Sequence, residues 1–402
     1  MIAASLGDMK RRGFFGQVSE VDSPPSGAES AGGAAPVITS PESRRIPEAT
    51  QQDAPNPKRS PAAGGSTPGF VSAHHRLYAS IARGLPAPRS VPRNFGDLLK
   101  NVIWPIENAL DSPMIEAAAR LGALEALEGG CTTVLDHHVG PRAVEGSLSL
   151  IAKAAQQVGV RTVCSYAASD LRGADRARQG LEESRRFIQS GGRGMMGLDA
   201  SFTASPETID LAIGIASELG VGLHAKVAEG IGDSGGGSDL VRRSKESWVL
   251  AHGVHLPDGL EIAGTIAHCP RSNMDRGVGY GSPSRFGPRV ALGTDGFGGN
   301  LLEEFRIAYG RLRETNVGTS PRLPWAWLEA GWLLVPEARQ DRVHWSLPDV
   351  EPEYLVANTG IRAITVVVGG RTVLDRGAPT QVDADEIRAK AAEQTRRLVS
   401  RL

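Results

Sequence analysis

The stretch Arg289-Val290-Ala291-Leu292-Gly293-Thr294-Asp295-Gly296 decides the fold that we expect. It is a short apolar run followed by a single carboxylate, that of Asp295. Burying an aspartate is costly unless a cation or a hydrogen-bond partner meets it. Earlier in the chain, His74, Glu229 and His252 each stand at the end of a similar apolar run. Four polar groups at four strand ends predict an active site at the mouth of a parallel barrel.

Eight apolar runs between residues 69 and 320 are candidates for the strands of this barrel. Their apolar residues are nearly continuous rather than alternating, as expected for strands that are buried on both faces. The runs are Phe70–His74, Thr132–Asp136, Thr162–Tyr166, Met195–Ala200, Val221–Val227, Trp248–Ala251, Ile262–Ala267 and Val290–Thr294. Helical patterns separate several of them, at Ile115–Leu127, Gly146–Val158, Ala174–Ser190 and after Ser205. Repeated strand–helix alternation predicts an α/β fold of the (β/α)8 TIM-barrel type.

The regions on either side of the barrel have a different character. Residues 1–68 are dense in Pro, Gly, Ser and Ala from about Val18 onward, and they show no sustained period, so we expect them to be disordered. Residues 321–402 are expected to form a small C-terminal subdomain. It contains a hairpin at Ile364–Leu374, with a Gly-Gly turn, and a helix from about Ala384 to Leu402.

Charge and composition exclude several classes of partner. The net charge of −1 argues against nucleic acid and acidic membranes, which would need a basic face. No apolar stretch approaches the roughly 18 residues of a membrane-spanning helix, and the start does not resemble a signal peptide. The three scattered cysteines form no CxxC pair and favour a reducing cytosol. We therefore expect a soluble, cytoplasmic protein that acts on a small molecule, and a homodimer would be an ordinary assembly for it.

Each candidate residue also has a purely structural interpretation. A histidine at a strand end is more often a structural residue than a catalytic one. On one interpretation the triplet Asp136-His137-His138 is a metal cluster. On the other it is structural, or it contacts the residues that bind the metal without binding the metal itself. The motif Arg271-Ser272-Asn273-Met274 is either a capped turn or a substrate loop. The order and spacing of the whole set favour a functional site.

Several motifs together resemble those of the amidohydrolase superfamily. They begin with Pro68-Gly69-Phe70-Val71-Ser72-Ala73-His74 and Cys131–His138, and continue with Ala267–Met274 and Leu292–Gly296. The branch that they resemble most is that of the aminohydrolases of the SsnA type, near the guanine and chlorotriazine deaminases. The resemblance runs with gaps from about Pro68 to Gly377.

This resemblance implies a hydrolase of non-peptide C–N bonds that uses one divalent metal, zinc or iron. In the family, an H-x-H pair on the first strand, a histidine on the fifth and an aspartate on the eighth hold the ion. His74 and Asp295 match two of these ligands. Glu229 matches the carboxylate that shuttles protons, and His252 the histidine that orients the attacking water. The chemistry is consistent, because a bound dication lowers the pKa of water and a carboxylate carries its proton.

Three positions depart from the family pattern. The second histidine of the first-strand pair is Arg76, and the fifth-strand ligand is Lys226; neither is a usual zinc or iron ligand. Asp199 stands where relatives carry a histidine that contacts substrate, and His268 is a second candidate on the substrate side. His75 should point away from the pocket of His74, because neighbours along a strand face opposite sides.

Three hypotheses follow from these departures. The first is a working metal-dependent deaminase. The second is a metal-free member of the lineage, a degenerate copy or a binder of a small anion. In it, Arg76 and Lys226 replace the dication and keep Asp295 and Glu229 ionised. The third is a new chemistry in which a desolvated Lys226 forms a Schiff base with a carbonyl substrate.

Overall fold

The computed structural model describes residues 65–88 and 90–402. The predicted disordered segment, residues 1–68, lies outside this part except for its last four residues. Of these, Ser66–Thr67 form strand β1, which pairs with a strand near the C-terminus. The prediction of disorder up to residue 68 is therefore wrong at its end. The physical reason for this error is that β1 is ordered by a long-range pairing, which no local sequence pattern reveals.

Eight parallel strands form the barrel, in two hydrogen-bonded sheets of order β2-β3-β4 and β5-β6-β7-β8-β9. Single bridges join the two sheets, at Cys164 with Gly194 and at His75 with Asp295. The ring of strands is thereby closed, as predicted. The strands are β2 Phe70–His75, β3 Cys131–His138, β4 Arg161–Tyr166, β5 Met196–Ala200, β6 Leu223–Val227, β7 Val249–His252, β8 Thr265–His268 and β9 Val290–Leu292. All eight match the predicted runs within three residues at either end.

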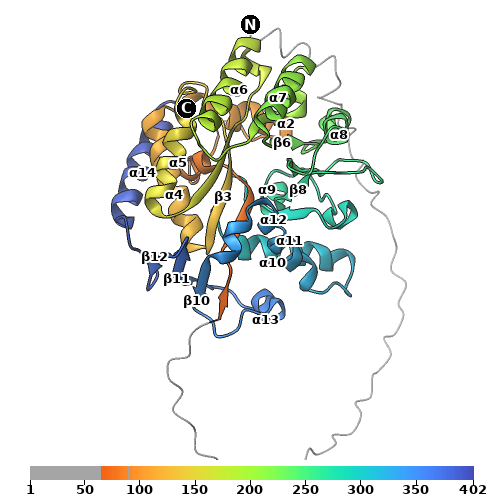
Figure 1. Ribbon diagram of the computed structural model, residues 1–402. Coiled ribbons are helices and arrows are strands. Elements are labelled where there is room, and N and C mark those ends of the chain that lie inside the picture. Colours follow the sequence, from red (N-terminus) through yellow and green to blue (C-terminus); the bar gives the residue numbers. More distant parts are fainter. Residues whose placement is uncertain (1–64, 89) are drawn as a thin grey trace, which may run out of the picture. The chain divides into compact units, whose positions relative to one another are not determined.

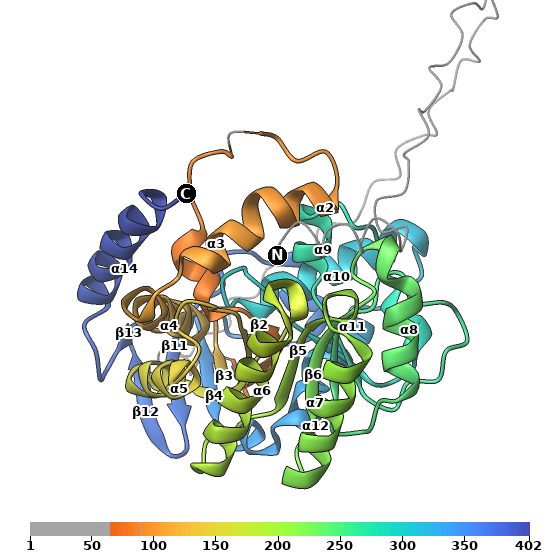
Figure 2. The same ribbon diagram turned by 90° about the horizontal axis from the view of Figure 1, so that it is seen from above.

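Helices surround the strands, and their ends follow the local sequence signals (Figure 2). Helix α4, Ser112–Glu128, begins after Asp111, whose side chain accepts a hydrogen bond from the backbone N–H of Met114. Helix α7, Pro206–Leu219, is capped in the same way by Ser205 and ends at Gly220, in a left-handed conformation. The other helices around the barrel are α5 Ser147–Val158, α6 Ala174–Gln189, α8 Ser234–Arg242, α9 Pro270–Asp275, α10 Leu301–Thr315, α11 Arg322–Glu329 and α12 Gly331–Leu334.

A separate, antiparallel sheet lies beside the barrel, with the order β1-β10-β11-β12-β13 (Figure 1). The predicted hairpin is confirmed as β11, Ala363–Val368, and β12, Arg371–Asp375. Strand β10, Arg342–Trp345, and the short β13, Ala378–Pro379, were not predicted. The predicted closing helix is α14, Ala384–Val399, and a further short helix, α13, spans Pro352–Ala357.

One segment after β2 contacts the strand ends from outside. It contains α2, Phe95–Leu98, a π-helical turn at Leu99–Ile103 and α3, Trp104–Ala109. Glu107 of α3 accepts a hydrogen bond from Arg76, at the end of β2. Phe95 lies against Gly230, just beyond β6. The segment therefore covers the end of the barrel at which the polar strand ends meet. No helix in the described ranges is long and apolar enough to cross a membrane.

Candidate active site

The four polar strand ends converge, as predicted. His74 lies in β2 and His252 ends β7, whereas Glu229 and Asp295 stand just beyond β6 and β9. All four side chains are buried, with at most 4% of their surface exposed. Residues that are more than 200 positions apart in the chain therefore share one enclosed polar site.

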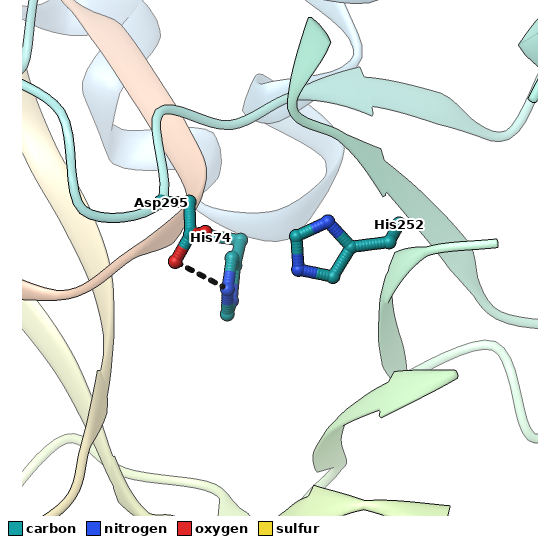
Figure 3. Close-up of side chains that lie close together, drawn as sticks. All are labelled: His74, His252 and Asp295. Atoms are coloured by element: carbon teal, nitrogen blue, oxygen red, sulfur yellow. Dashed lines mark ion pairs between the residues drawn. The ribbon is translucent and has the colours of Figure 1, made fainter. Parts of the chain in front are cut away.

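Three atoms of this site point toward a common centre (Figure 3). They are Nε2 of His74, Nε2 of His252 and Oδ1 of Asp295, which all lie within 4.8 Å of one another. The distance from His74 Nε2 to Asp295 Oδ1 is 3.5 Å, too long for a good hydrogen bond. None of the three atoms has a hydrogen-bond partner among residues 65–88 and 90–402. Three unsatisfied ligand atoms in a buried site form a donor set that can hold a metal ion.

The second ring nitrogen of each histidine and the second carboxylate oxygen of Asp295 each have a hydrogen-bond partner. Nδ1 of His74 lies 2.8 Å from Nε2 of His224, and Nδ1 of His252 lies 2.8 Å from Oδ1 of Asn273. Ser272 Oγ donates a hydrogen bond of 2.6 Å to Oδ2 of Asp295. Such outer partners fix the orientation of metal ligands. The residues present therefore fit a divalent ion with three protein ligands.

Protonation states agree with this donor set. Burial lowers the pKa of both His74 and His252, so each ring is neutral and can offer a lone pair. Burial opposes the ionisation of Asp295, but the guanidinium groups of Arg276 and Arg76 outweigh it. The pKa of Asp295 consequently lies well below its usual range, and the group is a carboxylate.

The backbone is strained at the same place. His252 and Asp295 have φ values of 74° and 47°, and Ala228, next to Glu229, has a φ of 46°. Left-handed backbone is unfavourable for residues with a Cβ and persists where the surrounding structure enforces it. The fold thus maintains an unfavourable geometry at three of the strand ends that build the site.

Arg276 is the residue of the site that the sequence did not reveal. Its Nη1 donates to Oε1 of Glu229 at 2.6 Å, and its Nη2 lies 2.6 Å from Oδ2 of Asp295. It follows directly after α9 and reaches the site from there. Its position two residues beyond the Arg271–Met274 motif was the only signal in the sequence, and the path of that loop was not predictable.

Arg76 and Lys226 were expected together to keep Asp295 and Glu229 ionised, and in the structure each also has a nearer carboxylate. Nη2 of Arg76 lies 2.7 Å from Oε1 of Glu107. Its Nε lies 3.7 Å from Oδ1 of Asp295. The hydroxyl of Tyr78 also donates to Glu107, at 2.8 Å. Glu107 is closer because α3, an element missing from the prediction, crosses the end of β2.

Lys226 pairs most closely with Asp199, and its charge also helps to lower the pKa of Glu229. Its Nζ lies 2.6 Å from Oδ1 of Asp199, on the adjacent strand β5, and both side chains are buried. The ion pair thus engages the amine that the Schiff-base hypothesis needs as a free nucleophile.

The remaining candidates surround the site. Nδ1 of His75 lies 2.6 Å from Oγ1 of Thr294. The His75 ring therefore points away from the three converging atoms, as expected for neighbours along a strand. His268 is buried beside Trp327, and neither of its ring nitrogens has a partner in the described part of the chain. His137 lies between His74 and His224, with ring centroids 5.3 Å and 4.6 Å away. Of the Asp136-His137-His138 triplet, none joins the three-atom group, so the structure favours a supporting role.

Comparisons with known proteins agree with this site. The profile of the amidohydrolase family matches residues 66–329. A 5-methylthioadenosine/S-adenosylhomocysteine deaminase from Pelotomaculum thermopropionicum is 28% identical over 386 residues, covering 83% of this chain and 86% of that protein. A 5'-deoxyadenosine deaminase from Methanopyrus kandleri is 28% identical and covers 60% of both chains.

Solved structures share the fold. An adenosine deaminase from Xanthomonas campestris with bound zinc superposes with a TM-score of 0.71, at 18% identity, over 84% of this chain and 87% of that one. A zinc-containing variant of the atrazine chlorohydrolase TrzN from Arthrobacter aurescens gives a TM-score of 0.70 at 21% identity, over 82% and 88% of the two chains.

Proposed function

Because the chain belongs to the amidohydrolase family, we propose that it hydrolyses a non-peptide C–N bond and removes an amino group from a small heterocyclic compound. The observation that carries the proposal is the group of three unpaired ligand atoms on His74, His252 and Asp295. The names of the relatives support an amino-substituted purine nucleoside as the first substrate to test.

His74, His252 and Asp295 would hold the divalent ion, zinc or iron. Such an ion supplies a Lewis acid that lowers the pKa of water toward neutrality. In the family pattern, the residues at positions 76 and 226 are histidines that bind the metal. Here they are Arg76 and Lys226, and His252 would serve as a ligand instead. Two histidines and one carboxylate are a sufficient protein ligand set for a catalytic metal.

Glu229 would move the proton. Burial opposes its ionisation, but the charges of Arg276 and Lys226 outweigh that effect and lower the pKa of Glu229, so it begins as a carboxylate. Its Oε2 lies 3.6 Å from Nε2 of His252, beside the three ligand atoms. Glu229 would accept a proton as the oxygen of water adds to the carbon that bears the amino group. It would then return that proton to the nitrogen as the C–N bond breaks and ammonia leaves.

The test is ammonia release by the full chain loaded with zinc or iron, with 5-methylthioadenosine, S-adenosylhomocysteine and 5'-deoxyadenosine as substrates. We expect turnover of at least one of them, and loss of turnover in Glu229→Gln. A protein that carries one ion per chain and releases no ammonia from any amino-substituted heterocycle would contradict the proposal.

A second candidate is a metal-free protein that binds a small anion or has lost activity. The observation that favours it is the pair of contacts from Arg276 to Glu229 and Asp295, which gives both carboxylates a cation without any metal. Metal analysis of the purified protein separates the two candidates, because only the first predicts about one ion per chain. A cytoplasmic location and a homodimer stay predictions; the three cysteines are buried and free, in agreement with a reducing compartment.

A further inference from the structure

Arg276 shares two carboxylates with the predicted metal site. We propose that its guanidinium is an internal cation that competes electrostatically with the divalent ion for Asp295 and Glu229 and so sets the metal affinity of the site. This inference rests on the proposed function, since it concerns the same three ligands. It assigns to one residue of this chain a regulatory role toward the metal.

The geometry places both cations on one carboxylate. Arg276 contacts Oδ2 of Asp295 at 2.6 Å, and Oδ1 of the same group is the unpaired ligand atom. The ion and the guanidinium can therefore bind at the same time, but each reduces the attraction that the other experiences. Screening is weak here, because the Arg276 side chain is only 7% exposed and Asp295 is fully buried.

The charge of the site supports competition rather than cooperation. The ion pairs of the site join four carboxylates to three cations, a net value of −1 for these seven groups. The carboxylates belong to Glu107, Asp199, Glu229 and Asp295, and the cations to Arg76, Lys226 and Arg276. Without the charge of Arg276 the site would carry −2, which one dication would neutralise.

The other side chains that hydrogen-bond to Asp295 and His252 are uncharged. Ser272 holds Asp295 and Asn273 holds His252, and neither adds charge to the site. Loss of a neutral support weakens metal binding about 10- to 100-fold in known sites. If Arg276 were only a support, its removal would also weaken binding. If Arg276 competes with the ion, its removal strengthens binding, so the sign of the change decides between the two.

The experiment is a zinc titration of the metal-free full chain, in competition with a chromophoric chelator, with the bound metal counted by mass spectrometry. Arg276→Gln and Arg276→Met remove the charge, and Arg276→Lys keeps it. Arg289→Gln is the matched control, because it removes an arginine that pairs with Glu246 on the surface. We expect zinc affinity to rise about tenfold in both neutral variants and to stay near the native value in Arg276→Lys and Arg289→Gln.

The outcomes separate this inference from the proposed function. Native protein that binds zinc, with tighter binding in the neutral variants, supports both. Zinc binding only in the neutral variants supports the inference and overturns metal dependence of the native chain. Unchanged or weaker binding in folded neutral variants, as judged by circular dichroism, overturns the inference and leaves the proposed function standing. Absence of zinc binding in every variant overturns both.

Discussion

Lys226 and Asp199 form a buried ion pair, with 2.6 Å between Nζ and Oδ1. The family resemblance implies a histidine at each of these two positions. The structure shows the two side chains as ion-pair partners on the adjacent strands β6 and β5, so each buried charge has a counter-charge. Arg76 has such a counter-charge in Glu107 of α3.

The Lys226–Asp199 pair should be strongly coupled in stability. Lys226→Met leaves a buried carboxylate without its cation, which costs about 3–5 kcal/mol of unfolding free energy. The double change Lys226→Met with Asp199→Leu should cost clearly less than the single one. Urea unfolding of the single and double variants measures this coupling. The exposed pair Arg185–Glu218 is the control, and equal coupling in both pairs would contradict a special role for the buried one.

The roles of Asp295 and Glu229 should separate metal binding from catalysis. Asp295→Asn removes a ligand and should abolish stoichiometric zinc. Glu229→Gln should keep the zinc and lower the rate about 10²- to 10⁴-fold, the usual contribution of a positioned acid–base group. Zinc content and ammonia release are measured on the same samples. Loss of zinc in Glu229→Gln would show that this carboxylate is a ligand rather than a proton carrier.

Restoring the family histidines should improve metal binding at a cost in stability. In Arg76→His with Lys226→His, two further ligands are available, so zinc should bind more than about tenfold tighter. The metal-free form should unfold at a lower temperature, because Glu107 and Asp199 lose their cations. Chelator competition and calorimetry test the two effects. Native zinc affinity in the double variant would mean that the strand positions no longer face the ion.

Stability should fall as the pH drops below about 6.5. Burial lowers the pKa of His138 and of His268 from 6.5 to about 3. Between these values the unfolded chain binds more protons than the folded one, so the stabilisation is complete above 6.5 and is lost toward 3. Each histidine contributes a slope of about 1.4 kcal/mol per pH unit.

Urea unfolding at several pH values measures how the free energy of unfolding depends on pH. His268→Phe should reduce this slope by the contribution of one histidine. The substitution removes no hydrogen bond, because both ring nitrogens of His268 lack partners in the described part of the chain. A slope that is the same in the variant and in the native protein would contradict the prediction.

The sequence predicted the barrel well, because its strands are continuous apolar runs between capped helices. The convergence of His74, Glu229, His252 and Asp295 followed from the rule that parallel strand ends meet at one rim. The closest partners of Arg76 and Lys226, which are Glu107 and Asp199, were not predicted. Long charged side chains choose among several nearby carboxylates, and Glu107 lies in a segment whose path over the barrel has no local sequence signature. Arg276 was missed for the same reason.

The pairing of β1 with β10 has a consequence for how the chain folds. Ser66 lies opposite His344, so this contact closes a loop of about 280 residues. The entropy of such a closure costs about 5 kcal/mol, which is recovered only when the intervening barrel has already brought the two strands together. During synthesis β1 emerges long before its partner. The pairing of β1 with β10 is therefore expected to form last, and β10 is an open edge of the antiparallel sheet until then.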